Sequence, residues 1–169
     1  MIGKKRNINP DQSGRLLADP YWFLEATVHR EGKDIFNLAY RLCQDKEEAT
    51  EIARAAFLKT LKNYRRFKSR FHIYVFLYRA TFGIWKKRAG RMISRNEAGN
   101  NERMQVVRKG LAALPAPDNF IIVLRDIEGK SYLEIASIMK YHYRTVQSRL
   151  ARARKRLYAN ILPGWENRE

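Results

Sequence analysis

The sequence predicts an all-α protein built from two small helical domains, and two observations favour this fold class. Apolar residues recur at helical spacing in several separate segments, and no alternating run is long enough to require a sheet. One stretch, residues 89–102, contains two Gly, three Asn and one Ser and interrupts this pattern. We therefore expect residues 89–102 to be a short linker between a domain of residues 21–88 and a domain of residues 103–162.

The first domain is expected to contain helices that follow a loose arm of residues 1–20. From Ile35 onwards the apolar positions follow helical spacing. Asp45 is expected to cap a second helix, with Glu48 as its capping-box partner. A third helical stretch is expected at residues 73–87.

The second domain begins with two short helices and ends in a tail of residues 163–169. The first of these helices is expected to end before Pro115. Asp118 is then expected to cap a short apolar helix that ends near Gly129.

The rest of the second domain predicts a helix-turn-helix. Ser131 and Glu134 form a second capping box that opens one helix, and Tyr141 and His142 interrupt the pattern before a long basic helix. Two helices joined by a short turn, the second of them basic, are typical of this DNA-binding motif. The buried face of the long helix is expected to hold Val146, Leu150, Ala153 and Leu157.

The charge of the chain predicts a polyanionic partner. Lys and Arg number 34 against 17 Asp and Glu, which gives a net charge of +17. Basic proteins bind nucleic acid because binding releases condensed counterions. An anionic membrane is the rival partner, but no apolar run approaches the ~20 residues that span a bilayer, and no signal peptide is recognisable at the start. We therefore expect a cytoplasmic protein that binds nucleic acid and does not insert into a membrane.

The long basic helix is expected to read duplex DNA. Residues 140–156 contain seven cations and no acid. Arg and Gln pair with base edges, and Ser and Thr often bind phosphates. The residues expected to face bases are Arg144, Gln147, Ser148 and Arg152, and those expected on phosphates are Thr145, Arg149 and Lys155. A solvated basic face on a core helix would show the same pattern.

A second candidate surface lies in the middle of the chain. No acid occurs between Glu51 and Glu97, where 13 cations stand, and eight aromatic residues lie between Tyr64 and Trp85. Cations that follow a backbone beside rings that stack on bases are typical of single-strand binding. About half of the rings are expected to be core residues. Contacts to a melted strand are expected from some of Lys62, Arg65, Arg66, Phe67, Arg70, Phe71 and Tyr74.

The sequence predicts no catalytic site, cofactor or metal. His29, His72 and His142 are far apart and do not form the i, i+4 pair of a helical metal site. Cys43 is the only cysteine, and on its apolar helix face it is expected to be a small buried hydrophobe. There is no Gly-rich phosphate loop and no acidic cluster for magnesium. We therefore expect that the protein is not an enzyme.

The C-terminal half resembles region 4 of the extracytoplasmic-function (ECF) sigma factors, which are bacterial transcription initiation factors. The residues that carry this resemblance are Leu114 and Pro115, VLRDIEGKSYLEIA at 123–136 and TVQSRLARARKRL at 145–157. The resemblance implies a module that reads the upstream promoter element and contacts the flap of core RNA polymerase.

Residues 34–88 resemble region 2 of the same family more loosely, through LAYRL at 38–42, DKEEA at 45–49, Phe57-Leu58 and LYR at 77–79. The resemblance implies binding of the polymerase clamp helices and capture of unpaired bases of the downstream element. The residues that it places on polymerase are Glu48, Glu51, Ile52, Arg54 and Ala55. The family usually has an acid-Leu-x-Gln-acid pattern here, and Arg54 and Ala55 replace its Gln and its second acid.

These observations predict a factor that joins core RNA polymerase and directs it to promoters. The alternative is a sigma-like DNA-binding regulator that needs a helper protein, which the altered pattern at Arg54 and the short linker favour. A third reading is a protein-interaction module for an acidic partner, which would leave no sequence-specific DNA footprint. The resemblance also implies an anti-sigma partner, since sequestration between the two domains is common in such families.

Overall fold

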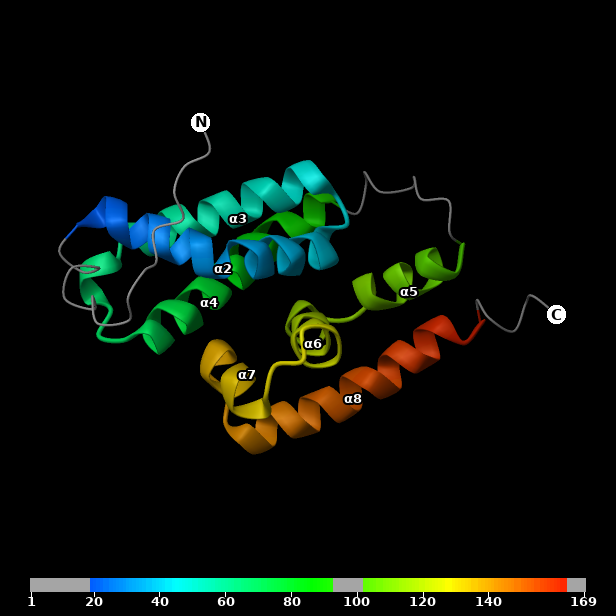
Figure 1. The fold of residues 1–169 in the computed structure, drawn as a ribbon. Coiled ribbons are helices and arrows are strands. Elements are labelled where there is room, and N and C mark those ends of the chain that lie inside the picture. Colours follow the sequence, from blue (N-terminus) through cyan, green and yellow to red (C-terminus); the bar gives the residue numbers. More distant parts are fainter. Residues whose placement is uncertain (1–18, 93–101, 164–169) are drawn as a thin grey trace.

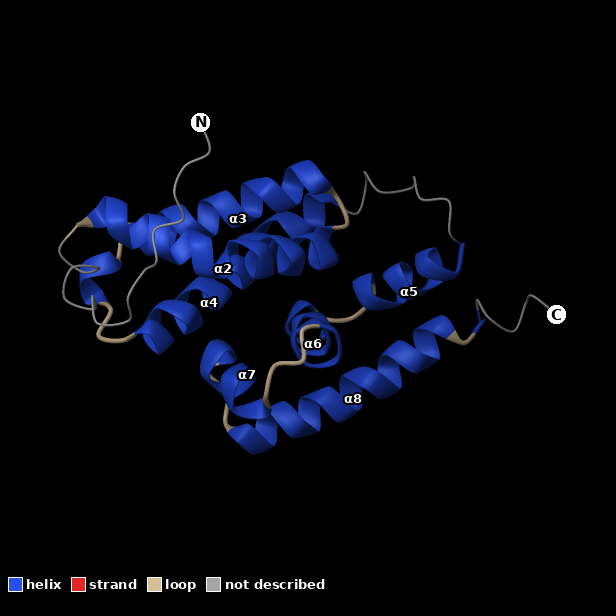
Figure 2. Ribbon diagram, in the orientation of Figure 1, coloured by secondary structure: helices blue, strands red, loops and turns tan. Residues whose placement is uncertain are grey.

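The computed structural model describes residues 19–92 and 102–163, and these fold into helices joined by short turns (Figure 1). No strand occurs in these two ranges, which confirms the predicted all-α class (Figure 2). The elements are α2 (Pro20–Cys43), α3 (Lys46–Leu61), the 3-10 turn η1 (Tyr64–Arg66), α4 (Arg70–Met92), α5 (Glu102–Ala112), α6 (Ala116–Ile122), the π-helical turn η2 (Val123–Ile127), α7 (Tyr132–Met139) and α8 (Tyr143–Ile161).

Helix α2 begins well before the point at which the apolar spacing predicts a helix. Pro20 occupies its first turn, and the Asp19 side chain accepts a hydrogen bond from the backbone N–H of Tyr21 at 2.8 Å. Its first half buries the polar side chains of Thr27 and Glu31, and the Thr27 hydroxyl donates to the carbonyl of Phe23 at 2.7 Å. These buried polar residues interrupt the apolar pattern, so the spacing identifies the helix only from its second half.

Helices α2, α3 and α4 pack together as the first group. Asp45 caps α3 as predicted, since its Oδ1 accepts a hydrogen bond from the Glu48 backbone N–H at 2.8 Å. The Glu48 carboxylate pairs with Arg88 of α4 at 2.8 Å, and it does not complete a capping box. The largest fully buried side chains of this group are Phe23, Ile35, Leu38, Ile52, Leu77 and Tyr78.

Helices α5 to α8 form the second group, in which α6 and α5 pack along α8 (Figure 1). The expected cap at Asp118 is wrong, because Pro115 precedes the first turn of α6 and Asp118 lies inside that turn. The apolar segment after it also does not stay α-helical to Gly129, because it becomes the π-helical turn η2 from Val123. Gly129 has φ 67°, a left-handed conformation that glycine adopts without a steric penalty.

Part of the predicted linker is helical in the structure. Helix α4 continues to Met92, so residues 89–92 are helical, and α5 begins at Glu102. The expected arm and tail fall almost entirely outside the described residues, as do residues 93–101.

The two groups pack against each other through α4. The rings of Phe82 on α4 and Phe120 on α6 lie 4.6 Å apart, and Trp85 lies 6.5 Å from the same Phe120 ring. One hydrophobic cluster therefore runs from the first group into the second. The Arg79 guanidinium adds polar contacts, because it donates to the carbonyls of Ile138 at 2.9 Å and Ser137 at 2.6 Å in the last turn of α7.

Candidate nucleic-acid interface

Helices α7 and α8 form the predicted helix-turn-helix. The capping box is confirmed, because the Ser131 hydroxyl accepts from the Glu134 N–H and the Glu134 carboxylate accepts from the Ser131 N–H at 2.8 Å. Lys140 ends α7 in the left-handed conformation, with φ 57°. His142 then caps α8, since its Nδ1 accepts from the Arg144 N–H at 3.3 Å.

One face of α8 is buried and the opposite face is open. Val146, Leu150 and Ala153 are buried as expected, and Leu157 is half-buried. The side chains on the open face bond only to neighbouring turns of α8, as between the Ser148 hydroxyl and the Thr145 carbonyl at 3.1 Å. The structure leaves five of the predicted duplex-contacting residues exposed on this helix, namely Arg144, Gln147, Ser148, Arg152 and Lys155.

Arg149 and Thr145 lie at the edge of this open face and are half-buried. The Arg149 guanidinium donates to Asp118 Oδ1 at 2.9 Å and lies over the Tyr141 ring, 5.0 Å from its centre. The phosphate contact predicted for Arg149 therefore competes with an ion pair inside the protein. Asp118 and Arg149 are 31 positions apart, so helical spacing does not predict this ion pair.

Two more arginines of α8 pair with acids of the same group. Arg156 reaches the other oxygen of Asp118, Oδ2, at 3.4 Å. Arg154 forms an ion pair with Asp126 of η2, in which its Nε lies 3.0 Å from Oδ2. Arg149, Arg154 and Arg156 are thus each paired with an acid, unlike the cations of the open face.

The basic and aromatic residues of the middle segment gather around η1 and the start of α4. Phe71 is 51% exposed, and Arg65 lies over the Tyr64 ring at 5.5 Å from its centre. The predicted cations of this surface are all exposed: Lys62, Arg65, Arg66 and Arg70. They form, with Phe71, an open basic surface at the end of the first group.

Two aromatic residues that are predicted to contact a melted strand, Phe67 and Tyr74, interact with other parts of the protein. Phe67 is 6% exposed and stacks on Phe23 at 5.9 Å, so it is a core residue of the first group. Tyr74 donates its hydroxyl to Glu134 of α7 at 3.0 Å. Burial raises the pKa of the Tyr74 phenol, and the neighbouring Tyr78 and Glu134 raise it further. Tyr74 therefore stays a neutral hydrogen-bond donor.

Comparison with protein families gives a match over the second group. Residues 104–157 match the family model described as Sigma-70, region 4. The chain is 38% identical over 64 residues to the ECF RNA polymerase sigma-E factor of Escherichia coli, which covers 38% of this chain and 34% of that protein. It is also 25% identical over 167 residues to the ECF RNA polymerase sigma factor SigE of Mycolicibacterium smegmatis, which covers 87% of this chain. The chain is therefore similar to ECF sigma factors, and its residues 104–157 match sigma-70 region 4.

A further relative is similar over most of the chain. The RNA polymerase sigma-H factor of Pseudomonas aeruginosa is 26% identical over 156 residues, covering 76% of this chain and 81% of that protein. The chain spans 64% of the length of the M. smegmatis relative.

Two solved structures share the fold of this chain. CnrH, in complex with the cytosolic domain of CnrY, matches with a TM-score of 0.68 and 19% identity, over 86% of this chain and 92% of that one. RpoE of Bartonella quintana, in complex with the anti-sigma factor NepR, matches with a TM-score of 0.60 and 19% identity, over 82% and 96%.

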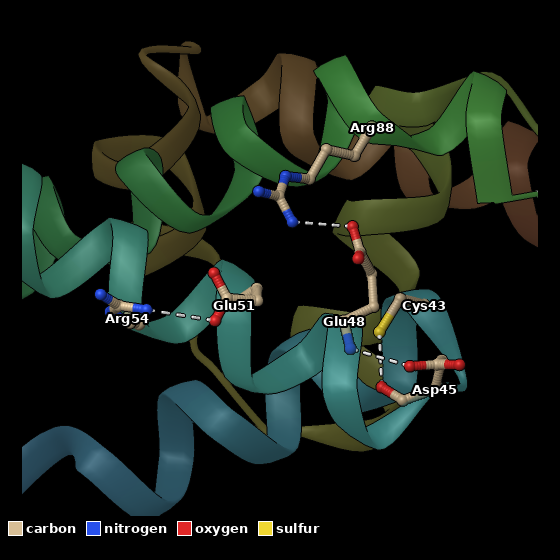
Figure 3. A network of polar contacts seen from close by, with 6 residues as sticks. All are labelled: Cys43, Asp45, Glu48, Glu51, Arg54 and Arg88. Atoms are coloured by element: carbon tan, nitrogen blue, oxygen red, sulfur yellow. Dashed lines mark hydrogen bonds and ion pairs between the residues drawn. The ribbon is translucent and has the colours of Figure 1, made fainter.

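Helix α3 carries the residues that the resemblance assigns to polymerase contact, and Figure 3 labels three of them, Glu48, Glu51 and Arg54. Glu51 and Arg54 are exposed and pair with each other at 3.4 Å. Glu48 is half-buried and is held by Arg88, and Ala55 is half-buried. Ile52 is fully buried, so it supports the helix from inside and does not lie on its outer surface.

Cys43 lies beside this surface as a buried thiol, as predicted for a small hydrophobe. Its Sγ donates to the Asp45 carbonyl at 3.2 Å (Figure 3). Burial raises the pKa of the Cys43 thiol to about 11, so it stays protonated at neutral pH and is a poor nucleophile.

Among residues 19–92 and 102–163, no three His, Cys, Asp or Glu side chains gather in a way that could hold a metal ion. In the same ranges no helix has the length and apolar character that crossing a membrane requires.

Proposed function

We propose that this chain is a transcription initiation factor that joins core RNA polymerase in the bacterial cytoplasm and directs it to specific promoters. The observation that carries the proposal is the open face of α8, which presents Arg144, Gln147 and Arg152 to solvent within a region that matches sigma-70 region 4. The relatives that are named RNA polymerase sigma factors support the same activity.

Helix α8 is the proposed reader of the upstream promoter element. The three side chains named above can form bidentate or single hydrogen bonds to base edges in the major groove, which admits an α-helix. Ser148 and Lys155 lie on the same open face, and Thr145 lies at its edge. Thr145 and Lys155 are the proposed phosphate contacts.

The surface around η1 is the proposed site of melted-strand capture. Exposed Lys62, Arg65, Arg66 and Arg70 supply positive charge for the backbone, and the exposed Phe71 ring supplies a platform for a base. Tyr74 could join this surface once its bond to Glu134 opens.

The outer surface of α3 is the proposed contact to the polymerase clamp, through Glu51, Arg54 and Ala55. The Glu51–Arg54 pair is open to solvent, so a partner can exchange it for its own charges at little cost. The two similar structures are complexes with the cytosolic domain of CnrY and with NepR. We therefore include a sequestering anti-sigma protein among the proposed partners.

Reconstitution with the cognate core polymerase tests the function. Transcripts made from genomic DNA with and without the protein are sequenced at their 5′ ends. Start sites that share two spaced motifs and need the protein would establish a promoter-specific initiation factor.

The second candidate function is a DNA-binding regulator that recruits polymerase only with a helper protein. The observation that favours it is α3, where Arg54 neutralises the neighbouring Glu51 in place of the acidic pattern usual in the family. If core polymerase makes no protein-dependent transcripts while the protein still binds duplex DNA sequence-specifically, this candidate is favoured.

A further inference from the structure

The cations of α8 fall into two sets that differ in their partners. Within the described residues, no ion pair joins an acid to any member of the exposed set, which is Arg144, Arg152 and Lys155. The second set is held by two aspartates and consists of Arg149, Arg154 and Arg156, of which Arg154 and Arg156 are still 50% and 57% exposed.

The two sets occupy different sides of α8. Successive residues of an α-helix are about 100° apart, so Arg149 and Arg156 lie on one flank of the buried stripe through Leu150. Arg154 lies on the opposite flank. Asp118 reaches the first flank from α6, and Asp126 reaches the second from η2. The exposed set lies opposite the stripe, on the open face.

Asp118 is the more buried of these two aspartates. Its side chain is 6% exposed, and its two oxygens meet different arginines, Arg149 at 2.9 Å and Arg156 at 3.4 Å. The partners stand seven positions apart on α8, so one carboxylate spans two turns of the helix. A buried carboxylate that loses its partners is strongly destabilising, so a rotation of α8 that separates them is disfavoured.

We infer that Asp118 is a positioning residue for DNA recognition: by holding Arg149 and Arg156 against α6 it fixes the rotation of α8 about its axis and keeps both guanidinium groups off the DNA phosphates. The inference rests on the proposed function, in which α8 enters the major groove. It limits the DNA contacts of the helix to Arg144, Gln147, Ser148, Arg152 and Lys155, with Thr145 at the edge.

Salt dependence of DNA binding tests the inference because it counts phosphate contacts. The probe is a short duplex of fixed sequence, and the full chain is titrated at several salt concentrations. Each additional phosphate contact steepens the slope of log K against log salt by about 0.9. Asp118→Asn removes the charge with almost no change in shape. We expect its slope to be steeper than that of the wild type by about 1 to 2.

A triple variant, Asp118→Asn with Arg149→Gln and Arg156→Gln, is the matched control. It removes the acid together with both of its partners, and we expect its slope to return to the wild-type value. Selection from a randomised duplex pool gives a second readout, in which Asp118→Asn should accept a broader set of sequences. Circular dichroism verifies that each variant is folded at the temperature of the titration.

A second variant covers the case in which Asp118→Asn does not fold. Asp126→Asn releases Arg154, which is already 50% exposed, and should steepen the slope by about 0.9. A folded Asp118→Asn protein with the wild-type slope and the wild-type sequence profile would overturn the inference, even if it melts at a lower temperature. A triple variant with a shallower slope than the wild type would also overturn it, because the arginines would then contact phosphates. If the wild-type protein does not bind duplex DNA, this result would instead contradict the proposed function.

Discussion

The hydroxyl of Tyr74 on α4 donates a hydrogen bond to the Glu134 carboxylate on α7 at 3.0 Å. Tyr74 belongs to the segment expected to contact the melted strand, and Glu134 caps the first helix of the helix-turn-helix. The two proposed DNA-binding units are thus bonded to each other in this structure. While this bond is present, the Tyr74 hydroxyl cannot donate its proton to a base.

Arg79 is expected to hold the two groups together. Its guanidinium bonds to the carbonyls of Ser137 and Ile138, and a hydrogen bond with a charged partner contributes about 1.5–3 kcal/mol. Arg79→Ala should therefore shift the protein toward conformations in which the groups are farther apart. Energy transfer between dyes at the exposed positions Glu47 and Tyr158, each replaced by Cys in a Cys43→Ser background, measures this shift.

The control for Arg79 is Lys87→Ala, an exposed cation on the same helix. Energy transfer that is unchanged in Arg79→Ala, or equally changed in Lys87→Ala, would contradict the expected role.

Gly110 is expected to resist substitution because α5 approaches α8 closely at this point. A Cβ at Gly110 would lie 2.5 Å from Ile161 Cγ2 and 3.2 Å from Leu157 Cδ1. Gly110→Ala should lower the free energy of unfolding by about 1–3 kcal/mol, as overpacking does. Gly83→Ala in α4 is the control, since nothing lies within 4 Å of its Cβ, and it should stabilise the helix by about 0.5–1 kcal/mol. Urea unfolding measures both, and a stable Gly110→Ala protein would refute the close contact.

Glu134 is expected to contribute to the free energy of unfolding at neutral pH and to lose this contribution in acid. Burial alone would raise the pKa of Glu134, but hydrogen bonds from the Ser131 side chain and backbone and from Tyr74 bring it below the ordinary value. A carboxyl group with a lowered folded-state pKa stabilises the fold above its unfolded pKa of about 4.3, and this contribution is lost as the pH falls through the folded value. The free energy of unfolding of wild type minus Glu134→Gln should therefore decrease on acidification. A difference that stays constant with pH would argue against this account.

Arg152 is expected to read one base pair of the upstream element. Arg152→Ala should weaken specific binding by about 1–3 kcal/mol and relax the preference at that position. Selection from a randomised duplex pool measures the profile, with Lys109→Ala, an exposed cation of α5, as the control. An unchanged profile would remove Arg152 from the set of base-reading residues.

Substitution of Phe71 is expected to affect binding of single-stranded DNA, and substitution of Phe67 is expected to affect stability. Phe71→Ala removes an exposed ring and should weaken binding of a single-stranded oligonucleotide by about 1–3 kcal/mol with little loss of stability. Phe67→Ala removes a buried ring and should lower the free energy of unfolding by about 3–5 kcal/mol. Fluorescence titration and urea unfolding distinguish the two effects. Equal oligonucleotide binding by Phe71→Ala and wild type would exclude a stacking role for this ring.

The sequence predicts most of the local structure of this protein, because the signals for it lie within one or two helical turns. The cap at Asp45, the capping box of Ser131 and Glu134, and the buried Val146 and Leu150 are all found as expected. The start of α2 was missed because buried Thr27 interrupts the apolar pattern.

Long-range pairing could not be read from spacing. Asp118 has the residue type and position of a helix cap, yet its carboxylate is used 31 positions away by Arg149. Phe67 stands among exposed cations and still packs inward, because Phe23 of a different helix covers it. Which ring or charge faces solvent depends on the arrangement of whole helices. The predicted contacts to DNA and polymerase stay predictions until binding is measured.

The contact between Phe82 and Phe120 also bears on how the protein behaves when it is alone. If the two groups separate on a promoter, these rings and Trp85 lose their mutual cover, and each large apolar side chain returned to water costs about 1.5–3 kcal/mol. An opened molecule without polymerase would then expose these three aromatic side chains to water, and its tendency to aggregate would grow with concentration. The closed form keeps these rings covered, and opening becomes less costly only where another surface replaces the lost contacts.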